Sequence, residues 1–293
     1  MFAGSIVALA TPFGPDDTVD QAALAALIDF HVDNGTAALV IAGTTGESAT
    51  LATDEHVQLV ERSVMLADGR IPIIAGTGSN STAQTIALSL DCQRVGVDGF
   101  LLVAPYYNKP GQEGMYLHFS AIADAVDKPV ILYNVPGRTC SDLLPETVGR
   151  LSQHERIVGI KDATGDLQRL KENQAAAVAD FVHLSGDDFT ALEFLKLGGH
   201  GFISVTANIA PQQSADLCDA VATGDFERAG KIDAELQKLH EQMFVESNPI
   251  PVKWALARMG LLSEAIRLPL TPLAVQNRKA LESTLLEAKL VEN

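Results

Sequence analysis

The chain is poor in the residues that mark several specialised classes of protein. It has three cysteines in 293 residues, and the odd number and wide spacing of Cys92, Cys140 and Cys218 suggest neither a disulfide framework nor a thiolate metal site. Its seven histidines form no HExxH or similar ligand spacing. We therefore expect no bound metal, and a reducing, cytoplasmic environment for the chain.

Positive charge and long apolar runs are scarce as well. Lysine and arginine number 21 against 37 aspartates and glutamates, so the formal net charge is −16. Binding to nucleic acid or to an anionic membrane depends on basic clusters, and this balance disfavours both. No segment approaches the roughly 20 apolar residues of a membrane-spanning helix, and the opening MFAGSIVALATP lacks the basic start of a signal peptide. We expect no nucleic-acid partner and no membrane association.

What the chain does contain is a repeated alternation of short aliphatic runs and segments with helical periodicity. Continuous apolar runs are typical of parallel strands that are buried on both faces. Eight such strands are predicted, at 5–10, 37–42, 71–75, 99–104, 129–133, 157–160, 181–184 and 201–205. The helices predicted after them span 20–34, 53–67, 81–95, 113–126, 144–151, 165–177, 188–197 and 211–222.

Eight strand–helix units in strict alternation predict an α/β fold, a closed (β/α)8 TIM barrel over residues 1–224. A doubly wound open sheet is the alternative. It normally carries a glycine-rich phosphate loop after the first strand, where this chain reads ATPFGPDD. Residues 225–293 show no strand pattern and are predicted to form a C-terminal helical extension, with helices at 225–243, 250–259 and 272–290.

The carboxyl ends of the predicted strands are polar, and this is where TIM barrels place their active sites. Lys161 follows the apolar run IVGI. An amine attacks a carbonyl only when it is neutral, and burial at a barrel mouth disfavours its charged form. Tyr133 ends the preceding strand, about 4.8 Å away if the two strands pair, and its phenol is suited to proton exchange during imine formation. Lys161 is therefore a candidate imine-forming nucleophile.

Other polar groups gather on the same rim. Thr44 and Thr45 lie between two glycines in GTTG, whose exposed backbone amides suit a carboxylate. Tyr106 and Tyr107 follow the fourth strand and add two phenols. Arg138, in NVPGRT, presents a guanidinium suited to a bidentate carboxylate contact. Together these groups suit imine chemistry on an α-keto acid better than phosphate or metal chemistry.

Each of these residues also has an ordinary interpretation when it is taken alone. Lys161 is then a strand-end lysine paired with a nearby acid such as Asp162, and Tyr133 is an aromatic packing residue. GTTG is a plain turn between a strand and a helix, and Arg138 is a surface arginine. The functional interpretation depends on the combination.

Six motifs on six strand ends resemble the dihydrodipicolinate synthase (4-hydroxy-tetrahydrodipicolinate synthase) family. They are GTTGESATL at 43–51, PYYNKP at 105–110, YNVPGRT at 133–139, GIKDATG at 159–165, SGDD at 185–188 and ISVTAN at 203–208. NPIPVKWAL at 248–256 and RLPLTP at 267–272 extend the likeness over essentially the whole chain. The resemblance implies a class I aldolase-type lyase that condenses pyruvate with L-aspartate 4-semialdehyde in diaminopimelate and lysine biosynthesis. It also implies that no cofactor is needed and that the chain forms a homotetramer, a dimer of dimers.

The resemblance implies roles for individual residues. Lys161 forms the Schiff base with pyruvate, and Tyr133 donates and accepts protons. Thr44 and Tyr107 complete a proton relay with Tyr133, and Tyr107 comes from a neighbouring subunit. The residues implied to bind substrate are Thr45, Gly186 and Ile203 for pyruvate and Arg138 for the carboxylate of the semialdehyde. One departure is Asp162, where many members carry glutamate; the acid is kept and its reach is shortened.

Regulated members of the family bind L-lysine in a pocket at a dimer interface. The matching positions here are Ser48, Ala49, Thr53, His56, Asn80, Gln84 and Tyr106. Thr53 stands where a histidine is often found, and Gln84 stands where a glutamate meets the ammonium groups of the ligand. A neutral amide contributes less to such a contact than a carboxylate does. We therefore expect weak or absent inhibition by L-lysine.

Three alternative functions remain. N-acetylneuraminate lyase and the keto-deoxy sugar-acid aldolases use the same lysine and tyrosine, but Arg138 favours a short carboxylated aldehyde over a polyol. A non-catalytic amino-acid sensor on the same barrel is disfavoured by the retained Lys161, Tyr133 and Thr44. A phosphate-handling barrel isomerase would carry a glycine-rich phosphate loop after strand seven or eight, where this chain reads SGDD and SVTAN.

Overall fold

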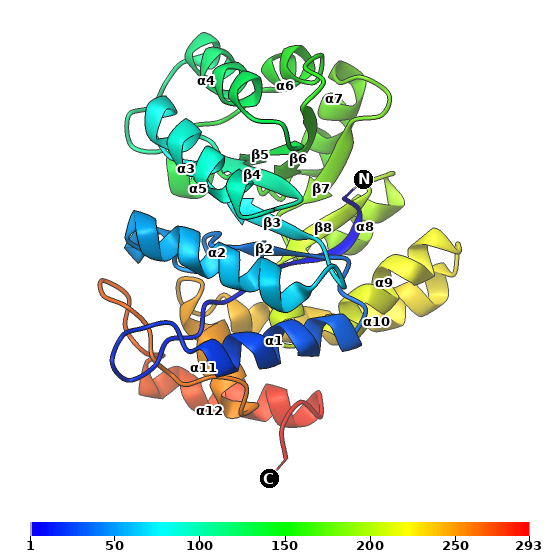
Figure 1. Ribbon diagram of the computed structural model, residues 1–293. Helices are drawn as coiled ribbons and strands as arrows, with labels where there is room; N and C mark the ends of the chain where they lie inside the picture. Colours follow the sequence, from blue (N-terminus) through cyan, green and yellow to red (C-terminus); the bar gives the residue numbers. More distant parts are fainter. Residues whose placement is uncertain (1, 293) are drawn as a thin grey trace.

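A computed structural model describes residues 2–292, in which eight parallel strands close into a barrel (Figure 1). The last strand pairs with the first, with Gly4 opposite Gly201 and Ile6 opposite Ile203. The predicted (β/α)8 barrel is therefore confirmed, and the open doubly wound sheet is wrong. The strands are β1 (Gly4–Ala8), β2 (Ala38–Ile41), β3 (Ile73–Gly76), β4 (Gly99–Val103), β5 (Val130–Asn134), β6 (Ile157–Asp162), β7 (Val182–Ser185) and β8 (Gly201–Ser204).

Each strand leads into a helix on the outside of the barrel. These helices are α1 (Gln21–Asp33), α2 (Thr53–Ala67), α3 (Thr82–Arg94), α4 (Gln112–Ala125), α6 (Pro145–Leu151), α7 (Leu167–Ala176), α8 (Ala191–Lys196) and α9 (Pro211–Ala222). Three short turns of helix in the loops were not predicted: η1 (Ser48–Thr50), α5 (Pro136–Thr139) and η2 (Thr206–Asn208). Helix α8 begins later than predicted because Asp187 accepts hydrogen bonds from the backbone N–H and the hydroxyl of Thr190, at 3.0 and 2.8 Å, which hold the preceding residues in a turn.

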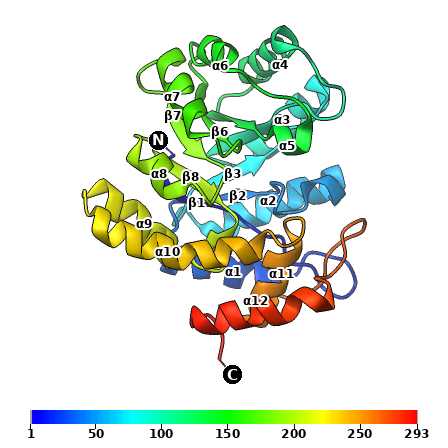
Figure 2. The same ribbon diagram turned by 180° about the vertical axis from the view of Figure 1, so that it is seen from behind.

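The C-terminal region consists of α10 (Phe226–Met243), α11 (Ile250–Arg258) and α12 (Val275–Glu287). Helix α10 packs on α9, and α12 packs on α10 and α11, at the end of the molecule away from α4 and α6 (Figures 1 and 2). Helix α11 also contacts η2, so this region reaches the loop after β8. Its separation as an extension, 225–293, from a barrel at 1–224 stays a prediction.

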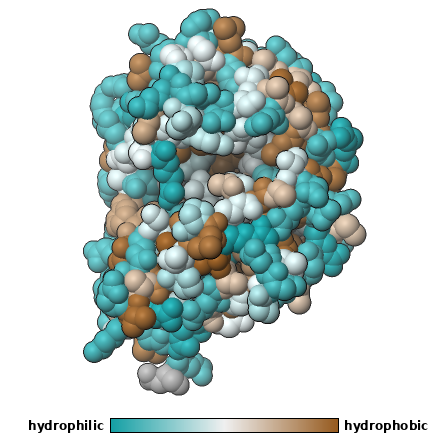
Figure 3. All heavy atoms as spheres, turned by 90° about the vertical axis from the view of Figure 1, so that its left-hand side faces the viewer, coloured by the Kyte–Doolittle hydropathy of each residue, from teal (hydrophilic) through white to brown (hydrophobic). Residues whose placement is uncertain are grey.

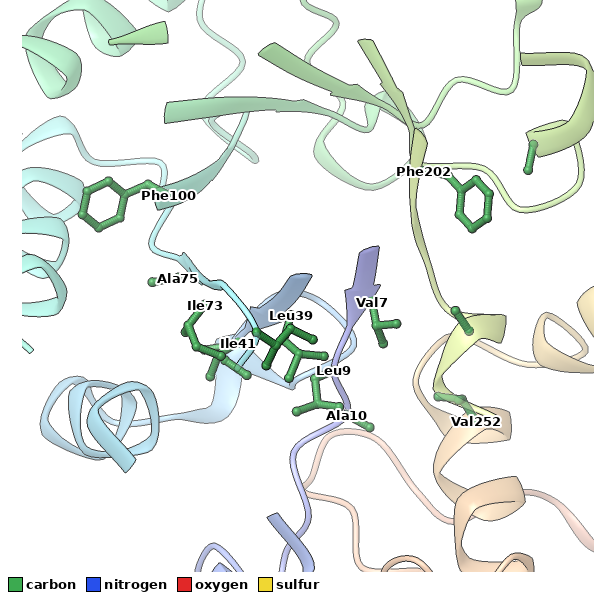
Figure 4. Close-up of a cluster of buried hydrophobic side chains, with 14 of the residues drawn as sticks. Val7, Leu9, Ala10, Leu39, Ile41, Ile73, Ala75, Phe100, Phe202 and Val252 are labelled. Carbon is green, nitrogen blue, oxygen red and sulfur yellow. The ribbon is translucent and has the colours of Figure 1, made fainter. Parts of the chain in front are cut away.

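Side chains of the strands alternate between two apolar clusters, as the two-residue period of a strand requires. Leu39 and Ile41 of β2 lie in the outer cluster, between strands and helices, with Ile73, Ala75 and Phe100 of the neighbouring strands (Figure 4). The inner cluster fills the barrel with Ile6, Ala8, Ala38, Val40, Ile74, Leu101, Ile131, Tyr133, Val135, Val182, Leu184 and Ile203. The barrel is thus packed along its length, and polar groups are left to its mouth.

Between Phe2 and Glu292 no helix is both long and apolar enough to cross a membrane. In the same part of the chain no group of three or more His, Cys, Asp or Glu side chains is arranged to hold a metal ion. All three cysteines are free thiols.

Five histidines between Phe2 and Glu292 are buried, and desolvation lowers the pKa of each, including His240. Burial lowers the pKa of His31 to about 3, and it lowers the pKa values of His56, His118 and His183 to about 4. The physical cause is desolvation, which costs the charged imidazolium more than the neutral ring. His31 is 0% exposed, and its Nδ1 lies 3.0 Å from the hydroxyl of Thr36. These rings are neutral in the folded protein at neutral pH.

Replacing His31 by asparagine should flatten the dependence of stability on pH. Below about pH 6.5 the unfolded chain binds a proton at this ring, whereas the folded chain does so only near pH 3, so stability is lost as the pH falls through that window. Near pH 4.5 this residue alone should cost the wild-type protein about 2–3 kcal/mol. Urea unfolding near pH 7.5 and near pH 4.5 measures the difference. Equal pH slopes for wild type and His31→Asn would contradict the assignment.

Candidate active site

Lys161 and Tyr133 lie side by side at the carboxyl ends of β6 and β5. Their Cα atoms are partners in the sheet, and Lys161 Nζ lies 4.3 Å from the centre of the Tyr133 ring. Both side chains are largely enclosed, with exposed fractions of 6% and 7%. A bulge sets this pairing: Val130 pairs with Ile157 but Ile131 pairs with Gly159, so β6 carries one extra residue. The amine and the phenol therefore meet in a low-dielectric setting at the barrel mouth.

Asp162 is not paired with Lys161, so this acid is not the partner that the ordinary interpretation of that lysine offers. The Asp162 carboxylate accepts hydrogen bonds from Asn134 Nδ2 at 3.1 Å and from the backbone and hydroxyl of Thr164 at 2.9 and 2.5 Å. Asn134 also donates to Asp142, whose pKa is lowered chiefly by its hydrogen bonds from Arg169. This network anchors the ends of β5 and β6 on the side that faces the helices.

Gly186 leaves the space in which the Lys161 side chain lies. A Cβ added at Gly186 would be 2.8 Å from Lys161 Cε and 2.7 Å from Ala163 Cβ, closer than real Cβ contacts come. Ile203, 1% exposed, belongs to the inner cluster together with Leu184 and Tyr133. Gly186 and Ile203, two of the three residues predicted to bind pyruvate, thus border the Lys161–Tyr133 pair or its supporting cluster.

The GTTGES loop after β2 brings Thr44 and Thr45 to the same mouth. Thr45 is buried, and its hydroxyl accepts a hydrogen bond from Asn248 Nδ2 at 2.9 Å. The backbone N–H of Glu47 donates to Thr44 O at 3.1 Å and closes the turn. Gly46 is pressed against the end of β1, since a Cβ there would lie 3.0 Å from Leu9 O. The loop has little freedom to move away from the barrel.

A cavity of about 500 Å³ opens above these loops. The face of the molecule at the strand ends is hollowed near its centre (Figure 3). Thr44 and Arg138 line the cavity, and so do Val135 and Val103, the sheet partner of Tyr133. Lys161 and Tyr133 are not among the residues that line the cavity, so it adjoins their enclosed pair on the side of Thr44, Val103 and Val135.

Arg138 is exposed in the turn α5 and points its guanidinium to the cavity wall. Its Nη2 donates to the backbone oxygen of Asn248 at 3.4 Å. Within residues 2–292 it forms no ion pair with a carboxylate, so its charge is free to meet an anionic ligand. Tyr107 is 88% exposed and has a φ of 73°, and it is not brought to Tyr133 within one chain. Its place in a proton relay stays a prediction.

Part of the predicted L-lysine pocket belongs to the same cavity. The residues of that set that line it are Ser48, Ala49, Thr53, His56 and Tyr106. The side-chain amide of Asn80 donates a hydrogen bond to the backbone oxygen of Tyr106 at 3.2 Å. Gln84, on α3, is exposed, and its side-chain oxygen accepts a hydrogen bond from the hydroxyl of Ser79 at 3.4 Å. Neither Asn80 nor Gln84 lines this cavity of the single chain.

Sequence reasoning did not identify three residues that support the site. Asn248 contacts Thr45 and Arg138, and Lys253 pairs with Glu47 in the GTTGES loop. The stretch NPIPVKWAL marked this region as a recognisable motif, but nothing in it indicates a contact with a loop about 200 positions earlier. A lysine in an otherwise apolar helix, PVKWAL, is the one local signal that a buried partner exists.

Comparison with known proteins finds relatives along the whole chain. Residues 1–288 match the model of the dihydrodipicolinate synthetase family. The 4-hydroxy-tetrahydrodipicolinate synthase of Alcanivorax borkumensis is 54% identical over 292 residues, covering 100% of this chain and 99% of that protein. The synthase of the same name from Pseudomonas aeruginosa is 58% identical over 271 residues, covering 92% of this chain and 93% of that protein. The crystal structure of the chloride-inhibited dihydrodipicolinate synthase from Acinetobacter baumannii complexed with pyruvate has a TM-score of 0.97 and 49% identity, covering 99% of this chain and 100% of that one.

Proposed function

Since this chain belongs to the dihydrodipicolinate synthetase family, we propose that Lys161 captures pyruvate as an imine and that Arg138 receives the carboxylate of L-aspartate 4-semialdehyde. The chain is an enzyme, a lyase of the class I aldolase type, and its reaction is that of the 4-hydroxy-tetrahydrodipicolinate synthases. The observation that carries the assignment of residues is the Lys161 Nζ beside the Tyr133 ring at 4.3 Å, with Gly186 leaving space for it.

The first half of the reaction takes place at Lys161. Its neutral Nζ attacks the keto carbon of pyruvate, and the carbonyl oxygen takes a proton to give a carbinolamine. Tyr133 delivers a second proton to the hydroxyl, which leaves as water and leaves an imine. Thr44 relays protons between Tyr133 and Tyr107, and Thr45 holds the pyruvate carboxylate through the amides of its turn.

The second half joins the two substrates. The imine draws electrons from the pyruvate methyl group, which loses a proton and becomes the nucleophilic carbon of an enamine. That carbon attacks the aldehyde of the semialdehyde, whose oxygen takes a proton. The amino nitrogen of the semialdehyde then attacks the imine carbon, the ring closes, and the bond to Lys161 breaks to release the amine. No step needs a metal or an organic cofactor.

We also propose a homotetramer built as a dimer of dimers. The exposed Tyr107 supports this, because a relay with Tyr133 needs a phenol that the single chain does not bring there. The free cysteines support a reducing compartment such as the cytoplasm. The contacts of α10–α12 with the barrel support the description of residues 225–293 as an extension that completes a catalytic barrel at 1–224.

Reduction with borohydride in the presence of pyruvate should add a reduced pyruvate unit to the peptide that contains Lys161. Lys161→Ala should abolish this labelling, and so should Lys161→Arg, because a guanidinium is never neutral in a protein. Mass spectrometry of the digested protein locates the label. A label on any other lysine, or none at all, would rule out the role of Lys161.

Gly186→Ala is a companion variant that tests the geometry at Lys161. Its new methyl group should displace the Lys161 side chain and slow labelling strongly without removing the nucleophile. Gly230→Ala is the matched control, because nothing lies within 4 Å of a Cβ at that position. Equal labelling rates in the two variants would show that the space at Gly186 is not used.

Arg138→Ala should raise the KM for L-aspartate 4-semialdehyde while pyruvate labelling is preserved. A hydrogen bond between charged groups contributes about 1.5–3 kcal/mol, which corresponds to roughly a 10- to 100-fold rise in KM. Arg138→Lys keeps the charge but loses the planar guanidinium, so its KM for the semialdehyde should lie between those of the wild type and Arg138→Ala. Steady-state kinetics with each substrate varied in turn measure this. A folded Arg138→Ala protein that no longer labels with pyruvate would refute the assignment.

Inhibition by L-lysine should be weak or absent. Gln84 offers a neutral amide where a carboxylate would pair with the ammonium groups of the ligand, a difference of about 1.4 kcal/mol or a factor of ten. Gln84→Glu should therefore increase the sensitivity. Inhibition curves measured at saturating pyruvate test this prediction. Half-inhibition of the wild type at submillimolar L-lysine would contradict it.

A further inference from the structure

A fully buried ion pair joins the loop after β2 to helix α11. Lys253 Nζ lies 2.5 Å from Glu47 Oε1, and each side chain is 1% exposed. The second oxygen of the same carboxylate accepts the backbone N–H of Arg267 at 3.0 Å. Glu47 is therefore held by two segments that follow it by 206 and 220 positions in the chain.

The pair belongs to a small charged network around one aromatic ring. Lys253 Nζ and Arg267 Cζ lie 4.4 and 4.1 Å from the centre of the Phe13 ring. Arg267 binds both carboxylate oxygens of Glu55, at 2.7 and 2.5 Å, and reaches Asp17 at 3.1 Å. Burial lowers the pKa of Lys253, and the facing carboxylate of Glu47 opposes that shift. Every charge in the network has a partner.

Stability alone is a poor reason for such a pair. Removing two charges from water costs several kcal/mol per ion, and well-packed apolar residues in their place commonly give an equal or higher stability. A charged, hydrogen-bonded pair differs from an apolar contact in its directionality, because the two atoms have to meet at one distance and angle. The ion pair therefore restricts the position of the Glu47 side chain more tightly than apolar packing would.

The position of Glu47 in turn sets the position of the threonines before it. Glu47 has a left-handed backbone, with a φ of 56°, and its N–H closes the turn on Thr44 O at 3.1 Å. Thr11 Oγ1 donates to Gly46 O at 2.7 Å from the other side. Thr45 has a second link to the same region, through Asn248 Nδ2 just before α11. The loop is thus clamped at both of its polar ends.

We propose that Glu47 and Lys253 are positioning residues for this reaction, which hold Thr44 and Thr45 in place without touching substrate. The proposal rests on the function proposed above, in which these threonines serve proton transfer and pyruvate binding. A catalytic group displaced by about 1 Å can slow a reaction on the order of 100-fold. Loss of the pair should therefore lower kcat and slow imine formation. The KM for the semialdehyde should change by less than about twofold, because Arg138 lies on a different loop.

A double-mutant cycle separates positioning from stability. Lys253→Met leaves the Glu47 carboxylate buried without its cation and should lower both the Tm and the rate of imine formation. Glu47→Gln/Lys253→Met removes both charges and should recover most of the Tm. Its rate of imine formation with pyruvate should stay about tenfold or more below that of the wild type. The single variant Glu47→Gln, which keeps the shape of the side chain, should show the same loss of rate with a smaller loss of Tm.

Arg258→Met is the matched control, because it removes an ion pair with Glu282 from the surface of the same helix. It should keep the wild-type rate and nearly the wild-type Tm. A double variant that regains both the Tm and the wild-type rate would overturn the positioning role while leaving the proposed function intact. A wild-type protein that forms no adduct with pyruvate would overturn the proposed function and this proposal together.

Discussion

The register between β5 and β6 is the constraint on which the site depends. Because Tyr133 and Lys161 are sheet partners, their side chains share the inner side of the barrel, while Asn134 and Asp162 share the outer side. The register exists only because β6 carries one extra residue near its start. Without that bulge, Tyr133 would lie opposite Ile160, and the amine would be shifted by one position along its partner strand. One added residue in β6 thus places the amine of Lys161 opposite the phenol of Tyr133.

The features that could be predicted from the sequence are those encoded in short, continuous stretches of it. Continuous aliphatic runs predicted all eight strands, and the polar residues at their ends predicted where Lys161, Tyr133 and Arg138 would gather, because parallel strands end on one face. Bounds were less accurate where side chains redirect the backbone, as Asp187 does before α8. The short helical turns in the loops have too few residues to show a period.

Contacts between distant parts of the chain could not be predicted in the same way. Asn248 and Thr45 are 203 positions apart, and their hydrogen bond depends on how α11 docks across the barrel mouth. The sequence shows Lys253 only as an unusual charge in an apolar helix, and it does not indicate that Glu47 is its partner. Tyr107 is the opposite case: its sequence motif was plain, but its side chain is 88% exposed in the single chain, and its place in a proton relay stays a prediction. Local sequence patterns thus predict where groups such as Lys161 and Tyr133 lie. The contacts of Asn248 and Lys253 that support the site depend on how α11 packs against the barrel.

The clamp on the GTTGES loop also has a consequence for the order of events during synthesis. A chain emerges from the ribosome from its N-terminus, and the early parts begin to fold before the later ones exist. All eight strands have been made before Asn248, Lys253 and Arg267 appear. The nascent barrel can close before these three residues have left the exit tunnel, whereas the GTTGES loop is secured only after they have. The loop is therefore fixed in a later step of synthesis than the one in which the barrel forms.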